Sequence, residues 1–90
     1  MKIKELLSDS SKWCKDVLAK DKNGQPIDYA NENACKWCLG GAIALCYTGK
    51  RYVKICKIVE SQIPGTIPEW NDEEGRCFED VKRLVEELNI

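Results

Sequence analysis

The sequence predicts one small domain, residues 1–90, of the α+β class with mainly helical structure. Apolar residues recur with helical spacing in four segments, and one Asn-Gly dipeptide between two of them signals a hairpin turn. Hydrophobic residues make up 43% of the chain and charged residues 32%, a balance that excludes a disordered polypeptide. A chain of 90 residues suffices for a single core.

The N-terminal segment is predicted to form a short amphipathic helix at about residues 2–9, because Ile3, Leu6 and Leu7 lie on one helical face. It lacks the apolar stretch of a signal peptide. The longest uncharged run, residues 37–49, is too short to cross a bilayer. We therefore expect a cytoplasmic protein, whose thiols stay reduced.

Residues 13–20 fit two patterns. Their apolar side chains have helical spacing, and Ser10 could cap such a helix. However, Asn23-Gly24 follows them, and this dipeptide is typical of a hairpin turn. Pro26 would confine the second strand to a sheet edge, because proline has no N–H to donate. We favour a short β-hairpin at about residues 15–30.

The centre of the domain is predicted to be a helix at about residues 33–48. Asn31 or Asn33 would cap its start, and Gly49 would end it. Nearly all of its side chains are apolar, so this helix needs neighbours on several sides.

Two amphipathic helices are expected to complete the fold, at about residues 50–62 and 77–88. Between them, residues 64–75 are rich in proline and glycine and are predicted to form a loop. The outer face of the first of these helices carries Lys50, Lys54 and Lys57.

Charge is balanced over the whole chain but not along it. The net charge of −1 gives no indication of binding to nucleic acid or to a membrane. Residues 50–57 are basic without an acid, whereas residues 69–90 are strongly acidic. We interpret both segments as solvated faces; alternatively they attract each other or form a bipolar surface for a partner.

Six cysteines raise the question of metal or thiol chemistry. Cys35 and Cys38 form a single C-x-x-C pair, whereas structural zinc sites commonly use two such pairs. The residues before Cys35 are polar and unlike the buried strand of a thioredoxin-type site. Without a histidine, a Cys–His hydrolase is excluded. A thiol-dependent redox or covalent activity centred on Cys35 and Cys38, and a zinc-stabilised scaffold, remain as alternatives.

Packing is the favoured interpretation of most cysteines, because a buried cysteine behaves as a small hydrophobe. Cys38 is assigned mainly to the core. Cys35 would lie in the first turn of the central helix, where the helix dipole favours a thiolate, and is the candidate reactive thiol. Gly40 and Gly41 each cost about 1 kcal/mol against alanine inside a helix. They therefore predict close approach of another backbone.

Two segments, "KWCLGGAIAL" (36–45) and "IPEWNDEEGRCFEDVKRLVEEL" (67–88), carry a W-C-x-x-G-A helix motif and a W-N-D loop motif. A third, "WCKDVLAKDKNGQP" (13–26), fits a W-x-x-G-x-x-A-x-D-x-x-G-x-P pattern. Together they resemble a family of small bacterial and phage proteins known only as a domain of unknown function. The resemblance covers most of the chain, implies a strand at residues 15–21 and carries no activity.

The sequence departs from that family pattern at three positions. Asp16 stands where a glycine is usual, and Cys77 where a helix-capping threonine is expected. Phe78 occupies a position where many members have histidine, so a reactive pair of Cys38 with that histidine would be absent.

The two motifs supply the candidate binding residues, which are Trp37, Cys38, Trp70, Asn71 and Asp72. An aromatic ring beside hydrogen-bonding side chains suits a small polar ligand. The alternative is structural, with Trp70 in the core and Asn71 or Asp72 holding the loop. If the motifs met across the central helix, they would form one cluster.

We expect a non-enzymatic binding or interaction protein of phage or prophage origin. Its partner would be a host protein or a small polar ligand, reached in the host cytoplasm. The sequence assigns no catalytic residue, no metal ligand and no cofactor, and it contains no heptad pattern that requires an oligomer.

Overall fold

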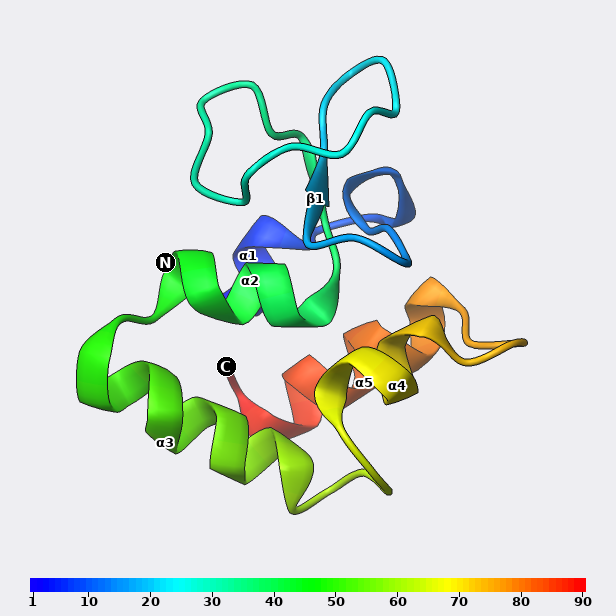
Figure 1. Cartoon of the computed structure of the whole chain (residues 1–90). Coiled ribbons are helices and arrows are strands. Elements are labelled where there is room, and N and C mark those ends of the chain that lie inside the picture. Colours follow the sequence, from blue (N-terminus) through cyan, green and yellow to red (C-terminus); the bar gives the residue numbers. More distant parts are fainter.

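Five helices and a two-stranded antiparallel ribbon form the protein, which confirms the predicted α+β, mainly helical class (Figure 1). The computed structural model describes all residues 1–90. The elements are α1 (Ile3–Leu6), a 3₁₀ turn η1 (Ser10–Lys12), β1 (Ala19–Lys20), β2 (Lys36–Trp37), α2 (Leu39–Cys46), α3 (Gly49–Glu60), α4 (Ile67–Asp72) and α5 (Phe78–Leu88).

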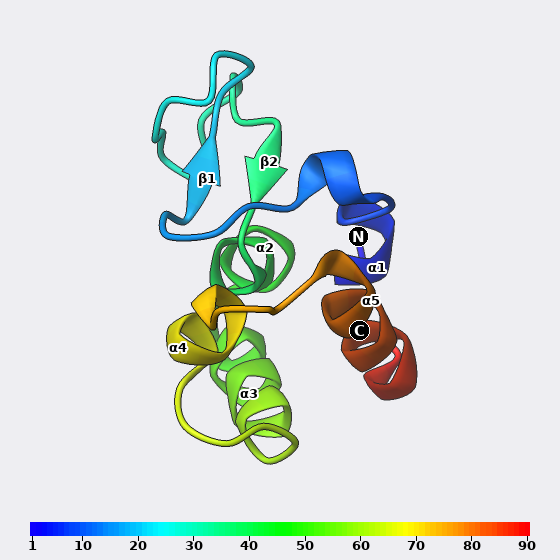
Figure 2. The same ribbon diagram turned by 90° about the vertical axis from the view of Figure 1, so that its right-hand side faces the viewer.

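Helix α2 lies at the centre of the domain, as its apolar sequence predicts. It packs against α1, α3 and α4, and Figure 2 shows it end-on among its neighbours. Leu39, Ala42 and Ile43 are fully buried within it. A helix that is apolar on most sides is stable only in such a surrounded position.

The start of α2 differs from the prediction, because the helix begins at Leu39 and not near residue 33. Asn31 caps no helix; its Oδ1 accepts a hydrogen bond from the Asn33 N–H at 2.8 Å in a local turn. Extended backbone follows, including β2. Cys38 is the residue that caps α2, through its sulfur.

The strand assignment after residue 15 is confirmed, but the second strand lies further along the chain than expected. Ala19 pairs with Trp37 and Lys20 with Lys36, antiparallel. The Asn23-Gly24 turn does form, and it leads back to a single bridge between Lys20 and Pro26. Because Pro26 has no N–H, the ladder cannot extend there, and β2 supplies the pairing.

The predicted loop at residues 64–75 contains a helix, α4, so that prediction is wrong in its middle. Thr66 caps α4 by accepting a hydrogen bond from the Glu69 N–H at 3.4 Å, and its hydroxyl donates to the Glu69 carboxylate at 2.7 Å. Pro68 fits here because the first turn of a helix needs no intrahelical N–H donors. Helices α3 and α5 lie within one or two residues of their predicted bounds.

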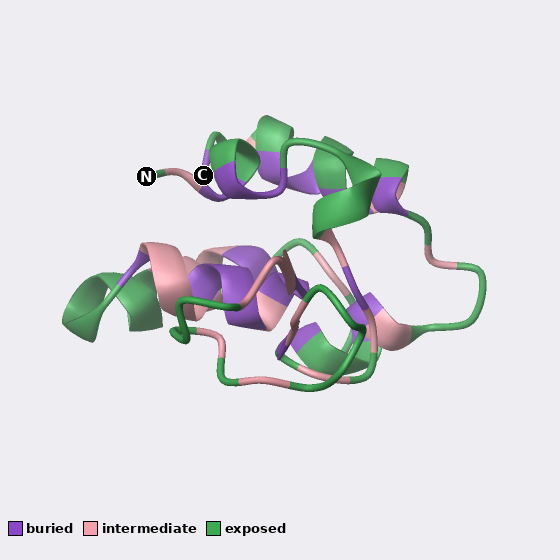
Figure 3. Cartoon of the chain, turned by 90° about the horizontal axis from the view of Figure 1, so that it is seen from above, coloured by how far each residue is buried: buried purple, intermediate pink, exposed green.

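The two ends of the chain meet on one side of the domain, where α1 packs against α5. The ammonium groups of Lys2 and Lys4 donate to Asn89 Oδ1 at 2.9 and 2.8 Å. Figure 3 shows the buried face of α5 turned inward and its exposed face turned to solvent. None of the helices has the length and apolar character needed to cross a membrane.

Candidate functional site

Asn71 is a fully buried polar residue, and its side-chain amide is saturated with hydrogen bonds. Its Oδ1 accepts from the Leu39 N–H at 3.0 Å and from Trp13 Nε1 at 2.8 Å. Its Nδ2 donates to the Cys14 carbonyl at 3.2 Å and to Asp72 Oδ1 at 2.8 Å. A primary amide makes four such bonds in total, so none remains for a ligand.

Asp72 holds the turn that precedes β1. Its Oδ1 accepts a hydrogen bond from the Asp16 N–H at 2.9 Å, in addition to the one from Asn71. Asp16 has φ of 73°, in the left-handed region that favours glycine. A glycine would adopt this conformation without strain.

Trp70 is buried, with 8% of its surface exposed, and a basic side chain covers it. The Arg76 guanidinium lies over the ring at 4.0 Å from the centroid, and its Nε donates to the Trp70 carbonyl at 2.8 Å. The same guanidinium pairs with Glu73 at 2.6 Å and with Asp80 at 3.8 Å. The contacts of all three W-N-D residues thus support the structural alternative.

Cys38 occupies the junction between β2 and α2. Its N–H donates to the Leu18 carbonyl at 3.1 Å, and its sulfur accepts from the Gly41 N–H at 3.3 Å. Burial raises the pKa of the Cys38 thiol, although the N–H groups of Gly41 and Gly40 act in the opposite direction. At neutral pH the thiol is therefore protonated.

The two sequence motifs do meet, at the N-terminus of α2. The bond from the Leu39 N–H to Asn71 places the W-N-D segment against the residue next to Cys38. Trp37 is buried beside them and donates from Nε1 to the Tyr29 carbonyl at 3.0 Å. The cluster is closely packed, and its polar atoms bond to one another.

Cys35 lies before β2, half-buried, with its N–H donating to the Lys20 carbonyl at 2.9 Å. Its predicted place in the first turn of a helix is wrong, because α2 begins four residues later. Cys35 therefore does not lie at the N-terminus of a helix. All six cysteines are free, and no three of the Cys, Asp and Glu side chains come together as a metal-binding group.

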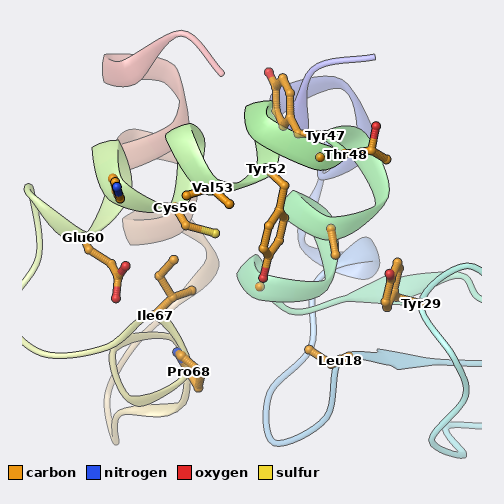
Figure 4. Close-up of a pocket in the computed structure, with 14 residues that line it drawn as sticks. Leu18, Tyr29, Tyr47, Thr48, Tyr52, Val53, Cys56, Glu60, Ile67 and Pro68 are labelled. Carbon is orange, nitrogen blue, oxygen red and sulfur yellow. The ribbon is translucent and has the colours of Figure 1, made fainter.

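A groove that the sequence did not predict lies between α3 and the ends of α2 and α4 (Figure 4). Its volume is about 790 Å³, within the range of sites for small molecules. The residues that line it are Leu18, Tyr29, Gly40, Ala44, Tyr47, Thr48, Gly49, Tyr52, Val53, Cys56, Lys57, Glu60, Ile67 and Pro68.

The groove concentrates the exposed apolar surface of the molecule. Three of the four large exposed hydrophobic residues line it: Leu18 is 50% exposed, Val53 48% and Tyr52 39%. The ring of Tyr52 projects into the groove (Figure 4). A hydrogen bond with Cys56, one turn later, raises the pKa of the Tyr52 phenol.

Sequence periodicity alone could not identify this groove, because its walls come from four separate segments. One signal was present: Val53 lies among basic residues on α3, where an apolar side chain has no core to join. Leu18 reaches the groove because its backbone packs against Gly41 of α2, and Tyr29 reaches it from the loop between β1 and β2.

A model described as "Family of unknown function (DUF6197)" matches residues 2–88. No curated protein and no solved structure matches the chain.

Proposed function

The chain belongs to this family of unknown function, and we propose from its own geometry that it is a non-enzymatic binding protein whose groove holds an apolar part of a partner. The observation that carries the proposal is the gathering of Leu18, Tyr52 and Val53 around one open groove. Elsewhere the apolar side chains form one continuous core. Exposed apolar surface concentrated in this way is typical of interaction sites.

The character of the lining also supports binding over catalysis. Tyr29, Tyr47 and Tyr52 offer large rings with hydroxyl groups, a combination common at recognition surfaces. The lining contains two charged side chains, Lys57 and Glu60; its other ionisable groups are the tyrosines and Cys56. We place this function in the cytoplasm, where the six free thiols would stay reduced.

The direct test compares Val53→Asp with wild type. Val53 is half exposed, so the aspartate has little effect on folding but puts a charge into the groove. The dye anilinonaphthalene sulfonate should bind the folded wild-type protein at one site, and Val53→Asp should weaken this binding at least tenfold. Lys82→Asp, on the exposed face of α5, is the control and should bind the dye as wild type does.

Affinity capture from a cell lysate extends the test to a natural partner. A protein captured by wild type and by Lys82→Asp, but not by Val53→Asp, would support the groove as its site. Equal dye binding and equal capture by all three proteins would overturn the proposal.

The thiol-dependent alternative needs a reactive Cys35 or Cys38. A chromogenic thiol reagent should modify Cys38 only at the rate of global unfolding, because that thiol is buried and protonated. Rapid modification of Cys35 or Cys38 in the folded protein at pH 7 would instead favour that alternative over the binding role.

A further inference from the structure

The walls of the groove restrict the kind of partner backbone that can enter it. Helix α3 borders the groove along its whole length, from Gly49 to Glu60. Twelve residues of helix extend about 18 Å, the length of three turns of a partner helix. The facing walls include α2 and α4, whose backbone groups are already bonded within their own helices. An extended peptide would find no sheet edge here, whereas a helix satisfies its own backbone.

Helix α3 carries a row of lysines beside the groove; Lys57 belongs to the lining of the groove, which also contains one carboxylate, Glu60. Lys50, Lys54 and Lys57 recur at positions i, i+4 and i+7, which places them in a row on one face of α3. All three are exposed. Both ion pairs of the molecule involve Arg76, so no lysine in this row has an acidic partner within the chain.

We infer, building on the proposed function, that the groove takes an amphipathic helix with an apolar stripe flanked by acidic residues. The stripe would pack on Leu18, Tyr52 and Val53, and carboxylates spaced by one helical turn would lie opposite the lysine row. The three lysines outnumber Glu60, so charge complementarity favours an acidic partner over a neutral or a basic one.

A second copy of this chain does not supply such a helix. Its most acidic helix is α5, which carries Glu79, Glu86 and Glu87 on the exposed face. The apolar side of α5, including Val81 and Val85, is buried in the core of its own domain. An acidic face without an accessible apolar stripe would leave the groove unfilled.

The experiment is a selection from a displayed library of about 18-residue helical peptides. Leucines are fixed at positions i, i+3, i+4 and i+7, and the flanking positions vary among Glu, Gln and Lys. We expect wild-type protein to enrich peptides with flanking Glu. The triple variant K50E/K54E/K57E should enrich Lys at the same positions and bind the best wild-type peptide about tenfold more weakly.

The matched control is K12E/K22E/K82E, which changes the net charge equally at exposed lysines that lie neither on α3 nor in the lining of the groove. It should retain the preference for Glu and the affinity of wild type. A proline placed mid-peptide should abolish binding, because it breaks the helix.

Other outcomes overturn the inference and separate it from the proposed function. If the selection shows no charge preference, or if both triple variants lose the same affinity for the peptide, the inference of an acidic partner is wrong. The groove would still stand as a binding site. Tight binding of decanoate, lost in Val53→Asp and without any selected peptide, assigns the groove to a small ligand instead. If neither peptides nor decanoate bind, and Val53→Asp leaves dye binding unchanged, both proposals fall.

Discussion

The backbone carbonyl of Leu18 packs directly against the α-carbon of Gly41. A Cβ atom at residue 41 would lie 3.0 Å from the carbonyl carbon of Leu18 and much closer to its oxygen than van der Waals contact allows. The same oxygen accepts the hydrogen bond from the Cys38 N–H at 3.1 Å. The close backbone approach expected at Gly40 and Gly41 is therefore confirmed at Gly41 and wrong at Gly40, which meets side chains alone. The contact at Gly41 joins the residue before β1 to the start of α2.

The first prediction contrasts the two adjacent glycines. Gly41→Ala should lower the free energy of unfolding by about 3 kcal/mol, because the backbone of Leu18 has to move and its bond to Cys38 is strained. Gly40→Ala should raise it by about 0.5–1 kcal/mol, since its Cβ would meet side chains at 3.8 Å and helix propensity improves. Urea denaturation measures both, and equal effects of the two substitutions would contradict the packing assigned to Gly41.

The second prediction concerns the buried amide of Asn71. Asn71→Ala should cost about 2–4 kcal/mol, because the Leu39 N–H, the Trp13 indole and the Cys14 carbonyl all lose their partner in the interior. Thermal and urea unfolding should show this loss. A cost below about 1 kcal/mol would mean that water replaces the amide and that Asn71 is free for another role.

A charged replacement sharpens this test. Asn71→Asp keeps an acceptor for Leu39 but loses the donor to Cys14 and lies beside Asp72. Burial and that neighbour should raise the pKa of the new carboxyl in the folded protein. A raised folded pKa gives stability at low pH that is lost as pH rises, so the variant should be closer to wild type at pH 4 than at pH 7.

The elements that the sequence predicted well are those fixed by local pattern. Helices α3 and α5 repeat apolar residues over three turns, so their bounds follow from the chain alone. Helix α4 was missed because Pro68 and nearby glycines suggested a loop. The capping signal Thr66-x-x-Glu69 was nevertheless present in the sequence.

The features that could not be predicted depend on contacts between distant segments. The start of α2 moves to Leu39 because residues 36 and 37 pair with β1, and periodicity cannot show that pairing. The groove likewise requires Leu18 and Tyr29 to stand across from α3. The W-N-D residues were identified as important, but their partners, above all Trp13 and Asp16, came only from the fold.

The third prediction concerns the cap of α5. Cys77 precedes the helix, and its N–H donates to the Asp80 carboxylate at 3.1 Å, which lowers the pKa of Asp80. Cys77→Thr should raise the free energy of unfolding by about 0.5–1 kcal/mol. A hydroxyl oxygen accepts a hydrogen bond from a backbone N–H of the first turn more strongly than sulfur does. Cys77→Ala is the control and should not stabilise. An unchanged unfolding midpoint for Cys77→Thr would show that the present cap is already sufficient.

The last prediction is a loss of stability at alkaline pH that originates at Cys14. Burial, followed by the neighbouring Cys38, raises the pKa of the Cys14 thiol to about 11. An unfolded thiol ionises near pH 8.5, so the stability linked to Cys14 is complete below that pH and is lost as pH rises through about 11. Under reducing conditions, the free energy of unfolding should fall between pH 8 and pH 10.5 by on the order of 1–2 kcal/mol more in wild type than in Cys14→Ala. Urea titrations at several pH values measure this difference. Parallel stability curves for the two proteins would show that the thiol ionises equally easily in the folded and unfolded chains, contrary to its burial.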